Sequence, residues 1–193
     1  PKRGWNVLDW GCHSGGLLEH LSDELGDRMK ITSGVEPDSV ARTEAECRMK
    51  DQYPIFYTDF SQVPGQSVDV FVSHEVLYLV PLTWFLLELK RVLRPGGAAF
   101  VALGSHAENT AWLRWRKALE TKHGHISYIH QPLDILAEGN ATGFHMEYQK
   151  LWPDGYPEML RYTPPADGWG EYLSIQEAFA FRDAKLIFQF WPR

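Results

Sequence analysis

The chain has 193 residues, of which 44% are hydrophobic and 23% are charged, and this is the composition of an ordinary globular domain. A chain of this length has room for one sizeable core, so a single domain over residues 1–193 is expected and most multidomain enzymes are excluded. The net charge of −6 disfavours partners that bind by general electrostatic attraction, namely nucleic acids and anionic membranes.

The cysteine content and the N-terminal segment indicate the cellular compartment. Cys12 and Cys47 are the only cysteines, too few for a disulfide framework, and neither lies in the spacing of a zinc site. The histidines at 123, 125 and 130 match no familiar metal spacing either. The N-terminal segment lacks the apolar core of a signal peptide, and no run of about 18 apolar residues indicates a membrane span. We therefore expect a cytoplasmic protein without a metal site.

Short apolar runs alternate with helical patterns through the first two thirds of the chain. Parallel strands need crossover connections, and such alternation predicts a doubly wound α/β fold, a mostly parallel sheet with helices on both faces. The predicted elements, in chain order, are strand 5–11, helix 17–25, strand 31–37, helix 38–50, strands 54–59 and 68–74, helix 81–94, strand 98–103 and helix 109–123.

The last third of the chain has a different pattern. A short helical stretch at 133–137 leads into residues 144–152, which alternate with a period of two and predict a strand, and residues 185–191 predict a final strand. Between these two strands, residues 153–172 contain four prolines, three glycines and several aromatic residues. A loop of this length inside a compact domain is usually functional or disordered.

The strongest chemical signal is the segment VLDWGCHSGG at residues 7–16, between the first strand and the first helix. Glycines there let the backbone approach a ligand, and the helix N-terminus attracts negative groups. A dinucleotide fingerprint would read G-x-G-x-x-G, whereas this segment reads D-x-G-x-x-x-G, so an NAD site is disfavoured. Glu36 ends the next strand, where such folds place an acid against a ribose; alone, a solvated acid is equally expected. Together the two features predict a nucleoside ligand.

Five ordered segments resemble the motifs of class I S-adenosylmethionine-dependent methyltransferases. They are VLDWGCHSGG, GVEPDS, the pair Asp59-Phe60, VDVFVSHEVLYLV and LKRVLRPGGAAFVALG. The resemblance implies a Rossmann-like sheet of seven strands with the last strand antiparallel. It also implies a cofactor-binding half at 1–104 and a substrate-side half at 105–193. The sequence departs from the family at His13, where a third glycine is usual.

The resemblance also implies a set of contacts with S-adenosylmethionine. Ser73 and His74 would follow the fourth strand and lie near the methionine amino group and the transferred methyl group. The remaining contacts would be Asp9, Gly11, Cys12, His13 and Gly15 with the methionine part, Glu36 with the ribose, and Pro37, Asp59 and Phe60 around the adenine.

Two histidines are candidates for catalysis. A sulfonium methyl group is already activated, so positioning the acceptor is the enzyme's main task. A hydroxyl acceptor would also benefit from a general base, and histidine has the most suitable unperturbed pKa. His74 is the first candidate and His106 the second. The alternatives are a purely structural role for His74 and a solvent-facing loop position for His106.

Acceptor choice in this family usually comes from segments outside the common motifs, here 105–130 and 153–172. Both are rich in aromatic residues, which favours a small-molecule acceptor. A protein or RNA acceptor is the alternative, and RNA would need the basic cluster Arg114, Arg116, Lys117 and Lys122. A non-catalytic regulatory protein of the same fold is a further alternative. No helix is predicted before the first strand, as expected if the chain is a trimmed version of a slightly longer natural one.

Overall fold

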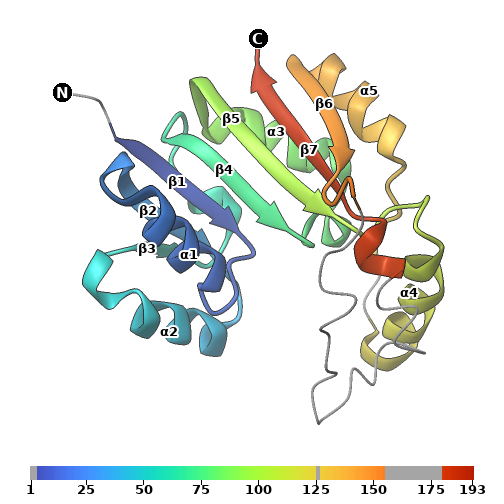
Figure 1. The fold of residues 1–193 in the computed structure, drawn as a ribbon, viewed down its shortest axis with the longest axis horizontal. Helices are drawn as coiled ribbons and strands as arrows, with labels where there is room; N and C mark the ends of the chain where they lie inside the picture. Colours follow the sequence, from blue (N-terminus) through green and yellow to red (C-terminus); the bar gives the residue numbers. More distant parts are fainter. Residues whose placement is uncertain (1–3, 125–126, 155–179) are drawn as a thin grey trace.

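The computed structural model describes residues 4–124, 127–154 and 180–193. Within them a seven-stranded sheet has the order β3-β2-β1-β4-β5-β7-β6 (Figure 1). Strands β1 to β5 are parallel, whereas β7 runs antiparallel to both of its neighbours. The strands are β1 (Trp5–Trp10), β2 (Met29–Val35), β3 (Ile55–Tyr57), β4 (Val68–His74), β5 (Leu93–Leu103), β6 (Phe144–Lys150) and β7 (Leu186–Pro192). The predicted doubly wound fold is confirmed.

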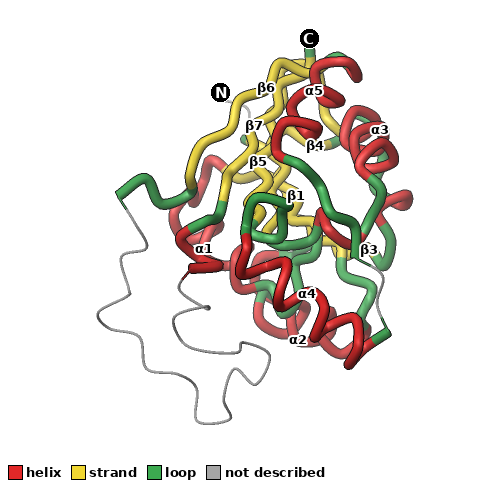
Figure 2. The backbone as a smooth tube through the Cα atoms, turned by 90° about the vertical axis from the view of Figure 1, so that its right-hand side faces the viewer, coloured by secondary structure: helices red, strands yellow, loops and turns green. Residues whose placement is uncertain are grey.

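Helices lie on both sides of this sheet. In the view along the sheet edge, α1 lies on one side of the strands and α3 and α5 lie on the other (Figure 2). Helix α4 lies near the edge at which the parallel strands end (Figure 1). None of the helices in the described ranges is long and apolar enough to cross a membrane. The helices are α1 (Gly16–Leu25), α2 (Ser39–Arg48), α3 (Leu82–Val92), α4 (Thr110–His123) and α5 (Pro132–Thr142).

Side-chain caps and close contacts explain where the helices begin and end. Asp38 caps α2 by accepting a hydrogen bond from the backbone N–H of Ala41, at 2.8 Å. Helix α5 is longer than the predicted stretch 133–137, because it continues through Gly139. A Cβ atom at Gly139 would lie 1.8 Å from the sulfur of Met146 on β6, so this glycine permits close packing and does not end the helix. Gly143, with φ of 101°, ends it.

Strand β5 begins five residues before the predicted start at 98. Leu93 pairs with Val68, and the register of the β4–β5 ladder shifts between Val68 and Val70. This irregularity accommodates Pro95 inside the strand, where a regular ladder would need its missing N–H. The predicted loop 153–172 lies outside the described residues, apart from its first two positions.

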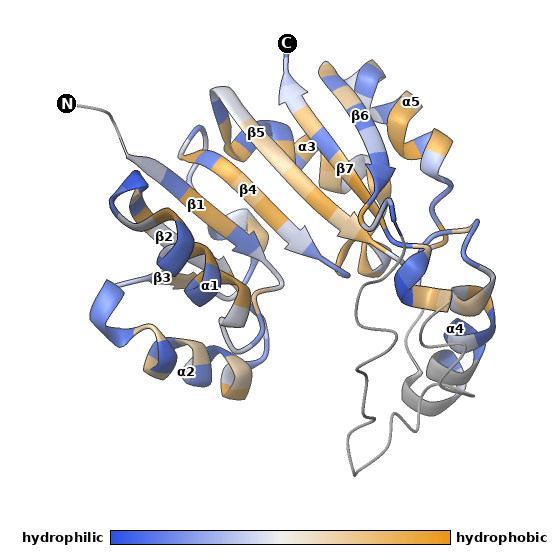
Figure 3. Cartoon of the chain, in the orientation of Figure 1, coloured by the Kyte–Doolittle hydropathy of each residue, from blue (hydrophilic) through white to orange (hydrophobic). Residues whose placement is uncertain are grey.

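The core is built around Trp10 at the end of β1. Its ring stacks on Phe85 of α3, with centroids 5.2 Å apart, and on Phe60, with centroids 5.3 Å apart. Figure 3 shows the hydrophobic colours running along β4 and β5, whereas α1 and α2 alternate with hydrophilic residues. Strand β1 lies between β2 and β4. From β1 the chain builds β2 and β3 toward one edge of the sheet and then returns past β1 to build β4 and β5 toward the other edge, so the strand order reverses at β1. Folds of this kind bind ligands in the resulting crevice at the carboxyl ends of the strands.

Candidate functional site

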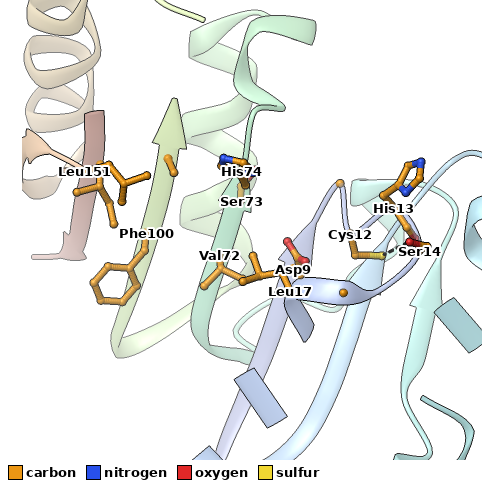
Figure 4. Close-up of a pocket in the computed structure, with 14 residues that line it drawn as sticks. Asp9, Cys12, His13, Ser14, Leu17, Val72, Ser73, His74, Phe100 and Leu151 are labelled. Atoms are coloured by element: carbon orange, nitrogen blue, oxygen red, sulfur yellow. Dashed lines mark hydrogen bonds between the residues drawn. The ribbon is translucent and has the colours of Figure 1, made fainter. Parts of the chain in front are cut away.

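A pocket of about 540 Å³ opens at the carboxyl ends of β1, β4 and β5 (Figure 4). One side is formed by the turn between β1 and α1, and the other by β4, β5 and the beginning of β7. Its lining residues are Asp9, Gly11, Cys12, His13, Ser14, Gly16, Leu17, Val72, Ser73, His74, Phe100, Ala102, Leu151 and Ile187. Six of the eleven residues expected to contact the cofactor are therefore brought together here: Asp9, Gly11, Cys12, His13, Ser73 and His74.

The turn between β1 and α1 needs glycine at two positions. Gly11 and Gly15 have φ values of 77° and 80°, which side chains rarely adopt. A Cβ atom at Gly15 would lie 3.1 Å from the Cβ atom of Ala45, so the turn packs directly on α2. The carbonyl of Val35 accepts hydrogen bonds from the N–H groups of Gly11 and Cys12, at 2.9 and 3.2 Å. The turn is thus fixed to the end of β2.

His13 has a left-handed backbone conformation without being glycine. Its φ is 46°, which explains why a glycine is usual at this position of the motif. The backbone N–H of His13 donates to Oε2 of Glu36, at 3.0 Å, and this bond holds the strained residue in place. The imidazole is exposed at the pocket, so the departure from the usual motif leaves the turn intact.

Glu36 is 8% exposed and organises the turn from the end of β2. Its Oε1 accepts a hydrogen bond from the N–H of Asp38 at 2.9 Å, and its Oε2 accepts the one from His13. A carboxylate has about four acceptor positions, so roughly two remain for a ligand. Two free acceptor positions match the two hydroxyl groups of a ribose.

Asp9 is the most unusual charged group of the pocket. It is 2% exposed, and no described residue donates a hydrogen bond to its carboxylate. Burial, with a smaller contribution from the nearby charge of Glu36, raises the pKa of Asp9 to about 7. A buried acid that lines a pocket without a partner favours a positively charged ligand group beside it.

Cys12, on the turn, and Ser73, on β4, are neutral groups of the pocket. Burial raises the pKa of the Cys12 thiol to about 12, and the charges of Asp9 and Glu36 add to this shift. The thiol therefore stays protonated and is no nucleophile. The hydroxyl of Ser73 donates to the carbonyl of Trp10, at 3.0 Å, and so joins the ends of β4 and β1.

The opposite side of the pocket combines an apolar wall with His74. Val72, Phe100 and Ile187 form the apolar wall. Burial lowers the pKa of His74, the positive charge of Lys185 lowers it further, and Glu75 opposes this shift. The ammonium group of Lys185 lies 2.7 Å from Nε2 of His74 and 2.9 Å from a carboxylate oxygen of Glu75.

Sequence reasoning missed Lys185, which immediately precedes the final strand. The register of β5 and β7 pairs Leu103 with Leu186, so the antiparallel strand starts where the parallel strands end. The polar residue before the apolar run LIFQF was the available signal, because an antiparallel last strand brings its first residue to the ligand-binding edge.

Comparison with known proteins indicates the family. Residues 8–101 match the family profile described as a methyltransferase domain, and this range contains all of the pocket lining except Ala102, Leu151 and Ile187. The match and the pocket point to the class I S-adenosylmethionine-dependent methyltransferases. Ubiquinone biosynthesis O-methyltransferase from Sinorhizobium medicae (strain WSM419) is 28% identical over 104 residues. That match covers 53% of this chain and 42% of the enzyme, so it spans less than half the length of this curated relative.

Solved structures of methyltransferases share the fold at low sequence identity. A putative methyltransferase from Haloferax volcanii, in complex with the Trm112 methyltransferase activator, has a TM-score of 0.77 and 20% identity, and the match covers 100% of this chain and 83% of that one. Geranyl diphosphate C-methyltransferase from Streptomyces coelicolor A3(2) has a TM-score of 0.71 and 16% identity, and the match covers 97% of this chain and 71% of that one.

Within this methyltransferase fold, several residues implied by the resemblance lie outside the pocket lining. Pro37 and Asp59 are exposed, and hydrogen bonds from Ser61 lower the pKa of Asp59. Phe60 is 2% exposed and packs in the core against Trp10, so the structure corrects the expectation that its ring meets the adenine. Gly15 and Glu36 also lie outside the lining; Gly15 is part of the turn, and Glu36 contacts it through the N–H of His13.

His106, the second catalytic candidate, lies away from the pocket of the methyltransferase. It is 3% exposed, not solvent-facing as the alternative expected, and its Nε2 lies 2.9 Å from the carbonyl oxygen of Ala184. A carbonyl only accepts hydrogen bonds, so the ring nitrogen donates, and His106 ties the end of β5 to the segment before β7.

Two further groups of side chains bear on metal and RNA binding in the described part of the chain. No group of three histidine, cysteine or acidic residues there could hold a metal ion. Of the basic cluster considered for RNA, Arg116 forms an ion pair with Glu120 at 2.7 Å and donates to the carbonyl of Ser127 at 2.9 Å. The side chain of Lys122 lies outside the described residues.

Proposed function

We propose that this chain binds S-adenosylmethionine in the pocket and transfers its methyl group to a small-molecule acceptor by in-line displacement. The observation that carries the proposal is Asp9, a buried acid that has no hydrogen-bond partner among the described residues and faces a pocket beside a glycine turn. The match to the methyltransferase domain profile supports the same reaction.

The residues of the turn fit this cofactor. Asp9 would attract the positively charged amino group, and the two free acceptor positions of Glu36 would bind the ribose hydroxyls. Gly11 and Gly15 keep the backbone free of Cβ atoms where the turn faces the ligand and α2. When bound, S-adenosylmethionine supplies a methyl group on a positively charged sulfur.

The contribution of the protein to the reaction is mainly positioning. The turn is fixed to β2 by Val35, and Ser73 joins β4 to β1, so both sides of the pocket keep a constant separation. Holding two reactants in line is worth about 7–11 kcal/mol of the barrier in well-oriented reactions. The apolar wall formed by Val72, Phe100 and Ile187 keeps water from the acceptor side.

The same wall supports a small apolar acceptor. Pockets for small molecules are mostly apolar and contain a few polar groups that set the orientation, and here His74 is the polar group next to the wall. The curated relatives are named for an O-methylation in ubiquinone biosynthesis, which favours an oxygen acceptor. RNA is disfavoured because Arg116 is already neutralised by Glu120.

Calorimetric titration with S-adenosylhomocysteine tests the cofactor site. We expect the wild-type protein to bind, and Asp9→Asn to bind about tenfold more weakly because one charged hydrogen bond is lost. Asp23→Asn, on the exposed face of α1, is the matched control and should bind like the wild type. Absence of binding to the folded wild-type protein would contradict the proposal.

Turnover is tested separately by measuring S-adenosylhomocysteine formation from S-adenosylmethionine with a panel of phenols, enols and amines. Product formation with one of these acceptors supports the proposed reaction. Tight binding of the cofactor without turnover on any of them would favour a non-catalytic regulatory protein of the same fold.

A further inference from the structure

Lys185 is a buried charge that contacts His74, a residue of the pocket lining. It is 7% exposed, and its Nζ lies 2.9 Å from Oε1 of Glu75 and 2.7 Å from Nε2 of His74. The backbone is fixed as well, because the carbonyl of Lys185 accepts a hydrogen bond from the N–H of Leu151, at 2.8 Å. The side chain therefore has one defined position between an acid and an imidazole.

Glu75 anchors this cluster from the end of β4. Its carboxylate accepts hydrogen bonds from the N–H of Gly104 and from the hydroxyl of Ser105, both at 2.7 Å, besides its contact with Lys185. Buried ion pairs persist when the remaining acceptor positions are satisfied in this way. The remaining contact of this carboxylate is the ion pair with the ammonium group of Lys185.

The ammonium form decides which nitrogen of His74 carries the proton. A contact of 2.7 Å between two nitrogen atoms needs one hydrogen and one lone pair. An ammonium group has three hydrogens and no lone pair, so Lys185 must donate and Nε2 of His74 must accept. In a neutral imidazole the proton then lies on Nδ1.

Burial and the positive charges beside His74 lower its pKa and so favour the neutral ring. Burial lowers its pKa most, and the positive charges of Lys185 and Arg182, both just before β7, lower it further. Glu75, on the adjoining residue, raises it and does not reverse the shift. No described residue accepts a hydrogen bond from Nδ1, so this N–H is left for a molecule in the pocket.

We propose that Lys185, anchored by Glu75, is a positioning residue that fixes His74 in the Nδ1–H tautomer, so that His74 donates a hydrogen bond to the acceptor. The consequence for the acceptor rests on the proposed function. A donor next to the reacting oxygen stabilises negative charge and removes no proton. The site therefore takes a hydroxyl group acidic enough to ionise near neutral pH, that of an acidic phenol or an enol, whose proton passes to water, and not an aliphatic alcohol that needs a base.

The tautomer of His74 can be read directly by NMR. In protein labelled with ¹⁵N-histidine, long-range ¹H–¹⁵N spectra at pH 7.5 distinguish the protonated from the unprotonated ring nitrogen, and the spectrum of His74→Gln assigns the signal. We expect the proton on Nδ1 in the wild type, and on Nε2 in Lys185→Met, where the donor is gone. Lys150→Met, which removes an exposed lysine paired with Asp183 at 3.4 Å, is the matched control.

A wild-type spectrum with the proton on Nε2 would overturn the proposal, and so would an unchanged tautomer in a folded Lys185→Met protein. If that variant does not fold, the wild-type spectrum decides alone. Titration adds a second readout: the pKa of His74 should rise in Lys185→Met and fall in Glu75→Gln, because the two neighbours act in opposite directions. Neither measurement uses cofactor or acceptor, so their outcome is independent of whether methyl transfer is found.

Discussion

Two clusters of charged side chains lie at the same edge of the sheet and differ in how their charge is balanced. Asp9 and Glu36, at the ends of β1 and β2, are two buried acids whose carboxylates pair with no described basic residue, since Arg42 donates only to the backbone carbonyl of Glu36, at 2.7 Å. Glu75 and Lys185, at the end of β4 and the start of β7, neutralise each other. On the proposed function, the first cluster would gain its missing charge from the ligand, whereas the second is complete and can only orient what it touches. Local charge balance thus separates a binding group from a positioning group.

The largest effect is expected from Glu36→Ala, which removes the acceptor for the ribose and releases the N–H of His13. Affinity for S-adenosylhomocysteine should fall by about 100-fold or more, since two hydrogen bonds to a charged group are lost. Calorimetry measures this affinity, and Glu46→Ala, on the exposed face of α2, is the control for the change in charge. An affinity within threefold of the wild type would remove Glu36 from the cofactor site.

The raised pKa of Asp9 predicts a pH dependence of binding. Because the ligand's amino group needs the ionised acid, affinity for S-adenosylhomocysteine should fall by about tenfold per pH unit below the pKa of about 7. Asp9→Asn should lack this dependence. Calorimetric titrations between pH 5.5 and 8 measure the affinity of both proteins. If the affinity changes equally with pH in the wild type and in Asp9→Asn, Asp9 is not the titrating group.

The same pKa predicts a change in the stability of the ligand-free protein. The folded state binds the Asp9 proton more tightly than the unfolded state does, since the pKa rises from 3.8 to about 7 on folding. Relative to Asp9→Asn, the wild type should therefore gain stability as the pH falls from about 7 toward 4, and it should be the less stable protein at pH 8. Thermal unfolding at several pH values measures the stability difference between the two proteins. A difference that does not change with pH would contradict this prediction.

Ser105→Ala tests the balanced cluster. It removes one donor to Glu75 and should lower the free energy of unfolding by about 1–2 kcal/mol while leaving the affinity for S-adenosylhomocysteine unchanged. Urea unfolding and calorimetry provide the two values. Ser67→Ala, whose hydroxyl donates to an exposed carbonyl, is the control. A loss of affinity without a loss of stability would mean that the two clusters are not distinct in function.

His13→Gly should have the smallest effect. Glycine keeps the N–H that donates to Glu36 and relieves the left-handed conformation, while it adds freedom to the unfolded chain. These contributions offset each other to within about 1 kcal/mol of stability, and the affinity should change by less than about threefold. His13→Pro, which removes the N–H, should bind far more weakly, and equal binding by both variants would show that the contact with Glu36 is dispensable.

The sequence allowed the acidic cluster to be predicted and not the balanced one, for a physical reason. Asp9 and Glu36 follow strands that are adjacent in the chain, so spacing along the sequence determines where they lie. Lys185 and His74 are 111 residues apart, and their contact depends on the antiparallel register of β7. Phe60 and His106 had the right positions in sequence, but side-chain packing turned both away from the pocket.

Helix and strand boundaries were predicted where local chemistry decides them and not where packing does. Asp38 caps α2, as the sequence at the start of this helix predicts, because the contact with Ala41 is local. Gly139, in contrast, lies inside α5 because Met146 of a distant strand leaves no room for a side chain. The start of β5 likewise depends on a shift in the ladder with β4, which no local pattern encodes.

The backbone of Glu75 has a φ of 59°, a left-handed conformation that strains residues other than glycine by about 1–2 kcal/mol. Replacement by glycine would relieve that strain and at the same time remove the carboxylate that anchors Lys185. Stabilising the fold and preserving the orientation of His74 are therefore opposing demands at this one position. Any programme of thermostabilisation that selects for folding alone would be drawn to Glu75 and would lose the tautomer that the cluster maintains.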